Sequence, residues 1–258
     1  MDNLKINRMA IYNQSEITKL NNSNNALIIM FPFAGGNMYS YKDIIKSINP
    51  KFDIYCPELP GRGDLYDIPL ISDINNLAQY IFISSIKNLR LNKKYLLYGH
   101  SMGALLVYLI SKSLAQENYN LPIRLIVSGR EGPSSKREKT TYDLPQTEFY
   151  NKLKLLGGVS PEVLMDKELM EYFDPIFRSD FQAVETYIYN TSHKFLNIPI
   201  TSLYGTEEGL TFENIHKWGI ETTNKTNYIS MTGDHFFIFK NPQNIARIIE
   251  NSLNKGND

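Results

Sequence analysis

Cysteine is almost missing from the 258-residue sequence, which contains only Cys56. A single cysteine excludes an internal disulfide and fits a reducing compartment. Net charge is also missing, because 27 basic residues balance 27 acidic residues, so nothing in the composition indicates a nucleic-acid-binding or membrane-binding surface. No charge-free apolar run reaches the roughly 18 residues of a membrane span, and the polar N-terminus lacks the apolar segment of a signal peptide. We therefore expect a soluble cytoplasmic protein with no nucleic-acid or membrane partner.

Motifs for metals and nucleotides are missing as well. The sequence contains no cluster of residues at metal-ligand spacing and no phosphate-binding loop. The stretch GRG at 61–63 is too short for such a loop, and we interpret Arg62 as part of a solvent-exposed turn. We therefore expect no metal and no cofactor.

Six short apolar runs alternate with helical patterns along the chain. The runs lack strict polar alternation, which is typical of strands buried on both faces of a parallel sheet. They cover 26–31, 52–57, 95–99, 124–129, 200–205 and 227–233. Helical patterns cover roughly 39–48, 74–89, 103–117, 212–221 and 242–254. This order predicts a single α/β domain over 1–258, with a mostly parallel central sheet and helices on both faces.

The segment at about 145–190 interrupts the alternation, because its apolar residues follow helical spacing and no strand pattern occurs in it. Its helical groups are separated by GGVSP (157–161) and DPIF (174–177). Four aromatic and aliphatic residues could line a pocket or pack within the insertion itself: Phe149, Leu153, Phe177 and Phe181. We predict a helical insertion. Extra core packing is one interpretation, but its position before the last strands favours a lid over a pocket.

The stretch GHSMG, residues 99–103, places a serine at an abrupt change from strand to helix. It matches G-x-S-x-G, and the strand before it and the helix after it are the context that a nucleophile elbow requires. In that turn the serine hydroxyl is exposed above the sheet. We therefore predict an α/β-hydrolase fold with Ser101 as the nucleophile.

A serine hydroxyl needs a base beside it, and the chain has four histidines. His100 is next to Ser101 in the sequence but should point elsewhere. His193 and His216 lie in polar surroundings that indicate surface residues. His235 follows the last predicted strand in a Gly-Asp turn, which is where a hydrolase of this topology places its base, and we select it.

The third group should be an acid after the preceding strand, since the chain order in this fold is Ser, Asp/Glu, His. Glu207 and Glu208 both stand at that position, in the stretch SLYGTEEGL. We select Glu208 because it lies at the far side of the turn, and Glu207 remains open. Asp234 is too close to His235 in the sequence and is better explained as a turn residue.

An oxyanion hole needs two backbone N–H groups directed at the developing negative charge. One should come from Met102, the residue after the nucleophile, and the other from the loop after the first long strand. That loop reads FPFAGGN at 31–37. Ala34 or Phe33 could present the second donor, and we select Ala34.

Several segments together resemble the type II thioesterases, stand-alone α/β-hydrolases that accompany nonribosomal peptide and polyketide synthases. They are FPFAGGNMYSY, PELPGRGD, YLLYGHSMGALL, VSGREGP, the long helical stretch from LLGGVSP to AVETY, and MTGDHFF. The resemblance runs from about residue 26 to 240. It implies that Ser101, Glu208 and His235 are the catalytic residues, although most members have Asp at the position of Glu208.

The resemblance also implies a function. It predicts hydrolysis of acyl thioesters on the phosphopantetheine arm of carrier proteins, which clears stalled or misprimed groups from a synthase. The arm belongs to the partner carrier protein and would enter beneath a mobile lid, with Arg62 near its entrance as the alternative to a solvated turn. A carboxylesterase of free small esters and a non-catalytic binding protein of this fold are the competing interpretations. We expect a monomer.

Overall fold

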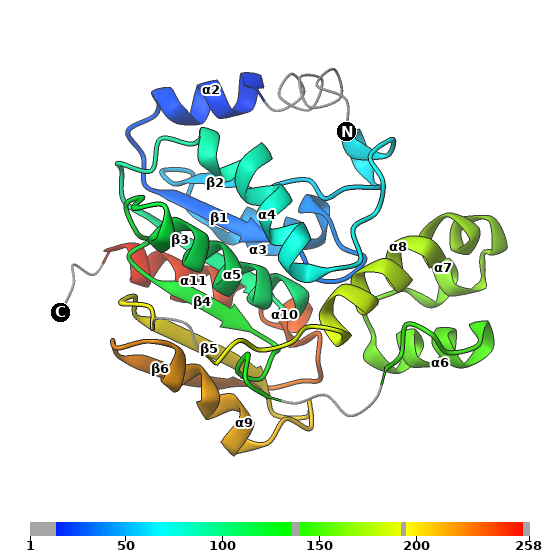
Figure 1. The fold of residues 1–258 in the computed structure, drawn as a ribbon. Coiled ribbons are helices and arrows are strands. Elements are labelled where there is room, and N and C mark those ends of the chain that lie inside the picture. Colours follow the sequence, from blue (N-terminus) through cyan, green and yellow to red (C-terminus); the bar gives the residue numbers. More distant parts are fainter. Residues whose placement is uncertain (1–13, 136–139, 192–194, 255–258) are drawn as a thin grey trace.

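The computed structural model describes residues 14–135, 140–191 and 195–254. At its centre is a six-stranded sheet in the order β2-β1-β3-β4-β5-β6 (Figure 1). The strands are β1 (Leu27–Phe31), β2 (Asp53–Tyr55), β3 (Tyr95–His100), β4 (Leu125–Ser128), β5 (Ile200–Gly205) and β6 (Thr226–Met231). All neighbouring strands pair in parallel. The predicted α/β fold is confirmed, and each strand lies in or overlaps a predicted apolar run.

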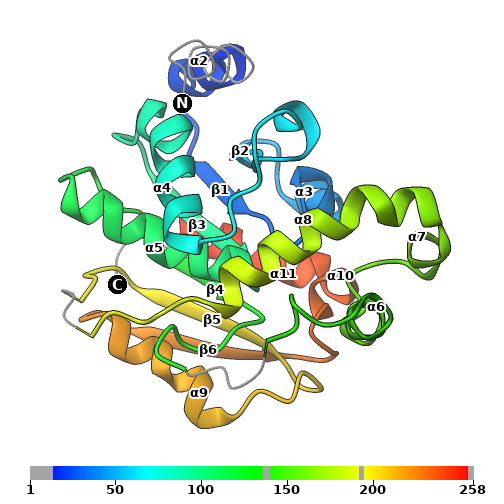
Figure 2. The same cartoon turned by 45° about the vertical axis from the view of Figure 1, so that its right-hand side comes forward.

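Helices cover both faces of the sheet (Figures 1 and 2). On one face lie α4 (Ile74–Ser84) and α5 (Met102–Gln116), and on the other lie α3 (Lys42–Ser47) and α11 (Pro242–Asn254). Alternate residues of β1 point to opposite faces: Leu27 and Ile29 pack with the first pair of helices, and Ile28 and Met30 pack with the second. Because both faces are covered, every residue of this strand is buried, which explains its uninterrupted apolar sequence.

Shorter elements complete the layers. They are α2 (Gln14–Asn22), η1 (Met38–Tyr41), η2 (Gly63–Leu65), η3 (Ile86–Asn88), α9 (Phe212–His216), η4 (Lys217–Glu221) and α10 (Phe237–Lys240). The predicted helices at 39–48, 74–89 and 212–221 therefore each consist of an α-helix joined to a 3₁₀ turn. Helix α2 was not predicted, because its sequence is short and polar; over 17–22, where burial is described, Ile17 and Leu20 are buried against the core.

The segment predicted as a helical insertion forms α6 (Gln146–Leu156), α7 (Pro161–Met165) and α8 (Lys167–Glu185), between β4 and β5. Helices α6 and α7 and the first half of α8 project from the body of the molecule (Figure 2). The predicted break at GGVSP separates α6 from α7, but the predicted break at DPIF is wrong, because α8 continues through Pro175. A proline removes one hydrogen bond from a helix, and the burial of the turn that follows it, at Ile176 and Phe177, compensates. The break lies instead at Asp166, whose side chain caps α8 by accepting from the Leu169 N–H at 3.0 Å.

Two expectations concern features that the sequence lacks. In the residues that the structure describes, no group of three or more His, Cys, Asp and Glu side chains could hold a metal ion. Over the same residues, no helix is long and apolar enough to cross a membrane. The expectation that the protein uses no metal and no cofactor of its own stays a prediction.

Candidate active site

Ser101 lies between the end of β3 and the start of α5, with a backbone φ of 54° and ψ of −113°. A positive φ is strained for a residue other than glycine, and a strained serine at this junction is the geometry of a nucleophile elbow. The flanking glycines allow the strand and the helix to touch. A Cβ atom at Gly99 would lie 2.1 Å from the Gly103 carbonyl oxygen, and one at Gly103 would lie 2.1 Å from that of Phe31.

His235 and Glu208 complete a hydrogen-bonded relay with Ser101. The Ser101 Oγ lies 3.1 Å from His235 Nε2, and His235 Nδ1 lies 2.5 Å from Glu208 Oε1. With the imidazole proton on Nδ1, the histidine donates to the carboxylate and accepts from the serine hydroxyl. The three residues are separated by 134 and 27 positions in the sequence, and the carboxyl ends of β3, β5 and β6 bring them together.

The turn after β5 decides between the two glutamates. The Glu208 side chain is 2% exposed, and its Oε2 accepts from the Gly205 N–H at 3.0 Å while its Oε1 faces His235. Glu207 is exposed to solvent. Asp234 acts as a turn residue: it accepts from the Phe236 N–H and pairs with Lys240, whose hydrogen bond is the main reason that the pKa of Asp234 is lowered.

Two of the other histidines, His100 and His216, lie outside the relay. His100 is fully buried, and its Nδ1 lies 2.9 Å from Ser128 Oγ. Burial, together with the neighbouring His235, lowers the pKa of His100 well below its usual value of 6.5, so this ring adds no positive charge beside the relay at neutral pH. His216 is partly buried and stacks on Tyr228, rather than lying free on the surface. His193 lies outside the described residues.

The loop after β1 presents backbone N–H groups beside Ser101. Gly36 N–H donates to the Phe33 carbonyl at 2.8 Å, which closes a tight turn, and Gly35 N–H donates to Asp180 Oδ2 at 2.7 Å. The amides of Gly35 and Gly36 are therefore occupied, whereas Ala34 lines the same pocket as Ser101 and His235. Met102 is the first residue of α5, where a backbone N–H has no partner within the helix.

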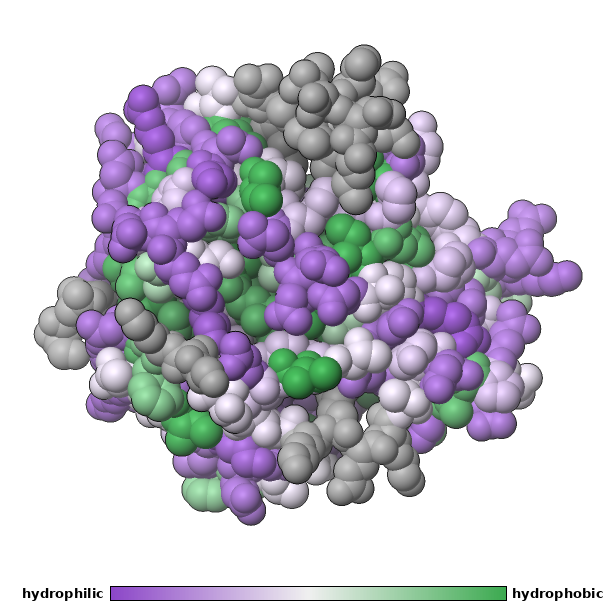
Figure 3. Space-filling model, in the orientation of Figure 1, coloured by the Kyte–Doolittle hydropathy of each residue, from purple (hydrophilic) through white to green (hydrophobic). Residues whose placement is uncertain are grey.

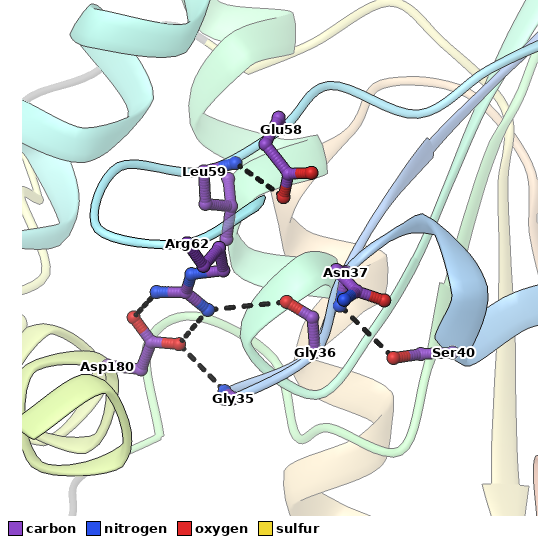
Figure 4. A network of polar contacts seen from close by, with 8 residues as sticks. All are labelled: Gly35, Gly36, Asn37, Ser40, Glu58, Leu59, Arg62 and Asp180. Atoms are coloured by element: carbon purple, nitrogen blue, oxygen red, sulfur yellow. Dashed lines mark hydrogen bonds and ion pairs between the residues drawn. The ribbon is translucent and has the colours of Figure 1, made fainter. Parts of the chain in front are cut away.

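Arg62 corrects one prediction, because it is only 5% exposed and does not belong to a solvated turn. Its guanidinium forms two hydrogen bonds with Asp180, at 2.7 and 2.8 Å, and a third at 3.3 Å with the Gly36 carbonyl (Figure 4). A buried arginine is stable in such a position because a carboxylate matches its planar fork. Sequence reasoning did not find Asp180, since a single acidic residue inside a predicted helix carries no motif.

A cavity of about 790 Å³ opens beside the relay. Its lining includes the relay residues themselves and, from the helical insertion, Leu153, Phe177 and Phe181. The fourth candidate, Phe149, is fully buried and packs its ring on Phe181 instead. On the face of the molecule seen in Figure 3, the surface is mostly hydrophilic, including that of the projecting helices. Within these helices, Phe149, Leu153, Met170 and Phe177 are buried in one cluster, whereas Leu155 and Met165 are exposed.

Part of the cavity wall is polar. The loop after β4 contributes Arg130 and Glu131, and the end of α8 contributes Glu185. Glu185 accepts from the N–H groups of Thr141 and Tyr142, at 2.6 and 3.0 Å, so its carboxylate fixes the chain that leads into the insertion. The cavity thus combines apolar side chains, from the insertion and from elsewhere, with polar side chains.

Comparison with known proteins agrees with this geometry. The model of the thioesterase domain family matches residues 26–253. The gramicidin S biosynthesis protein GrsT of Aneurinibacillus migulanus is 30% identical over 83% of each chain. The medium-chain S-acyl fatty acid synthase thioesterase of Rattus norvegicus is 29% identical, over 88% of this chain and 86% of the rat protein.

A solved structure shares both fold and sequence. The type II thioesterase BorB, from the borrelidin biosynthetic cluster, superposes with a TM-score of 0.81 and 28% identity, over 89% of this chain and 93% of BorB. The family match covers nearly all of the chain, and the elbow, the relay and the cavity are those of a hydrolase. The chain therefore belongs to the thioesterase family, is an enzyme of the α/β-hydrolase fold, and is a type II thioesterase.

Proposed function

We propose that this enzyme hydrolyses acyl groups bound as thioesters to the phosphopantetheine arm of carrier proteins, through a serine acyl-enzyme. The observation that carries the proposal is the relay of Ser101, His235 and Glu208 at the wall of a cavity with a partly apolar lining. The printed names of the relatives support the substrate class, since they include a gramicidin S biosynthesis protein and a thioesterase of the borrelidin cluster. In such a pathway the enzyme would remove stalled or misprimed acyl groups from a synthase.

The first half of the reaction acylates the serine. Ser101 Oγ attacks the thioester carbonyl carbon while His235 Nε2 takes its proton, and Glu208 stabilises the imidazolium that forms. The N–H groups of Met102 and Ala34 would stabilise the oxyanion of the tetrahedral intermediate. When that intermediate collapses, the C–S bond breaks and His235 returns its proton to the departing pantetheine thiol.

The second half hydrolyses the acyl-enzyme. A water molecule replaces the thiol beside His235, which removes a proton from it as it attacks the ester carbonyl. The same two N–H groups would hold the second oxyanion. Collapse breaks the bond to Ser101 Oγ, returns the proton to the serine and releases the free acid. All of the catalytic groups in this scheme belong to the protein.

The test is the release of acetyl from acetyl-phosphopantetheinyl carrier protein, followed by mass spectrometry of the carrier. The wild type should return the carrier to its free-thiol form, and Ser101→Ala should lower the rate by about 10³-fold or more, because the nucleophile is gone. Ser128→Ala is a matched control, since Ser128 is a buried serine at the end of the neighbouring strand and bonds to His100 rather than His235. That variant should retain most of the activity.

The competing interpretation is hydrolysis of free small esters. It predicts that p-nitrophenyl acetate is turned over with a kcat/KM equal to or above that of the acetyl carrier, whereas our proposal predicts a clear preference for the carrier. A non-catalytic binding protein would release no acid from either substrate, with or without Ser101.

A further inference from the structure

Arg62 and Asp180 form a buried ion pair outside the proposed relay. The side chains are 6% and 2% exposed, and they are 118 positions apart in the sequence. Arg62 comes from the loop before η2, and Asp180 comes from the second half of α8. Such a pair is costly to bury unless its geometry is favourable and its remaining polar atoms are bonded. Two additional bonds of this pair go to the loop that contains Ala34, whereas Arg62 Nε is buried without a partner.

The pair holds that loop at two consecutive residues. Asp180 Oδ2 accepts from the Gly35 N–H at 2.7 Å, and Arg62 Nη1 donates to the Gly36 carbonyl at 3.3 Å (Figure 4). Gly36 in turn donates its N–H to the Phe33 carbonyl at 2.8 Å. The Phe33 carbonyl and the Ala34 N–H belong to one planar peptide unit and point in opposite directions. Fixing the Phe33 carbonyl therefore fixes the direction of the Ala34 N–H.

Helix α8 also packs directly on the same loop. Gly35 has a φ of +75°, and a Cβ atom there would lie 2.0 Å from Cε1 of Phe177. Phe177 precedes Asp180 by three positions, so the two side chains lie on one face of the helix. One contact is apolar and the other is a charge-assisted hydrogen bond. Together they leave the loop little freedom to move independently of α8.

We propose that Arg62 and Asp180 are positioning residues of the oxyanion hole. The direction of the Ala34 N–H then depends on how α8 packs against the loop after β1. The inference rests on the proposed function, because it assigns the pair to the stabilisation of an oxyanion formed at Ser101. Neither side chain touches the substrate. Both act through the backbone of Gly35 and Gly36.

The test compares Asp180→Ala, Asp180→Asn and Arg62→Lys with the wild type. Asparagine can still accept from the Gly35 N–H, and lysine retains one charged donor, so both should be milder than alanine. For Asp180→Ala we expect kcat to fall about 10- to 100-fold, as for a catalytic group misplaced by about 1 Å. KM should change by less than about threefold, because the pair does not bind the ground-state substrate.

A second measurement isolates the oxyanion. An alkyl boronic acid forms a tetrahedral adduct with a catalytic serine, and one boronate oxygen occupies the oxyanion position. Its dissociation constant should rise in parallel with the loss of kcat across the three variants. Asp53→Asn is the control, because Asp53 pairs with Lys93 at 3.0 Å at the start of β2, away from the carboxyl ends of the strands. It should leave both quantities unchanged.

Single variants leave one charge buried and can fail to fold, so the double variant Arg62→Met/Asp180→Leu removes both charges together. Circular dichroism identifies the variants that remain folded. If a folded variant that lacks the pair keeps kcat and the boronic-acid dissociation constant within about twofold of the wild type, the pair is only structural and the inference is wrong. Failure of the proposed substrate is a separate result: the wild type would then hydrolyse p-nitrophenyl acetate but not the acyl carrier, and the variants can still be compared on that ester.

Discussion

The contrast between Glu207 and Glu208 depends on the geometry of one short turn. Both carboxylates follow β5, but only Glu208 turns inward, where it accepts from the Gly205 N–H and contacts His235. The Glu208 side chain reaches far enough to place one carboxylate oxygen at the Gly205 N–H and the other at His235 Nδ1. The structure thus supplies a physical reason for a glutamate at this position of the relay.

Substitutions at these two residues test that reason. Glu208→Gln should lower kcat by about 10³- to 10⁴-fold, because an amide no longer stabilises the imidazolium or enforces the tautomer with its proton on Nδ1. Glu208→Asp should retain more activity than the glutamine variant, since it keeps the charge but draws the carboxylate away from His235. Steady-state kinetics on the acyl carrier measure both effects. Glu207→Gln is the matched control, and a loss there as large as at Glu208 would contradict the assignment.

At the residue scale, sequence reasoning found the groups that belong to local patterns. Ser101 is defined by its flanking glycines and by the change from strand to helix, and His235 and Glu208 by their positions after strands. Arg62 and Asp180 were not found as a pair, because their contact depends on how α8 packs against a distant loop. A long charged side chain in a Gly-rich turn is usually solvated, and no local signal distinguished this case.

Among the helices, α8 divides into two halves at Pro175. In the first half Met170 is the buried residue, whereas the second half buries six: Ile176, Phe177, Ser179, Asp180, Ala183 and Val184. The second half packs on the core of the molecule, and the first half projects with α6 and α7 (Figure 1). A lid that moves should therefore move at Pro175, while the second half stays attached to the loop after β1, which contains Ala34.

Hydrogen exchange measured by mass spectrometry can test this division. Peptides covering 167–174 should exchange at least about 10-fold faster than peptides covering 176–185, because their helix opens without exposing the main core. Peptides from α5 provide the reference for slow exchange, since most of that helix is buried. Equal protection on both sides of Pro175 would show that α8 is one rigid unit, and the lid would then have to move as a whole or not at all.

The elements differ in how well the sequence predicted them. The six strands were predictable because burial on both faces requires an uninterrupted apolar run. Pro175 misled the interpretation of α8, since a proline usually ends a helix, and here the packing of the turn that follows it maintains the helix. Two expectations stay predictions: that the chain forms a single domain over 1–258, and that the insertion acts as a lid. The first concerns how the chain folds and the second concerns motion.

For the whole molecule, the single sheet connects two apolar layers, one on each face. Strands β1, β3 and β4 contribute side chains to both layers, so neither layer can be lost without exposing the other face of the same strands. The only tryptophan of the sequence, Trp218, lies in η4, near the β5–β6 edge of the sheet. It is fully buried, packs edge-on against Tyr108 of α5 and donates to the Arg130 carbonyl at 2.9 Å.

This arrangement predicts that the sheet and the helices on both of its faces unfold as one cooperative unit. In a urea titration, the fluorescence of Trp218 reports the β5–β6 edge, and far-ultraviolet circular dichroism reports all of the helices. The two curves should share one midpoint and one slope, as a two-state transition requires. A fluorescence transition at lower urea would mean that the β5–β6 edge, which supplies Glu208 and His235, unfolds separately. The relay would then be lost before the rest of the fold, and activity would decline with fluorescence rather than with helical content.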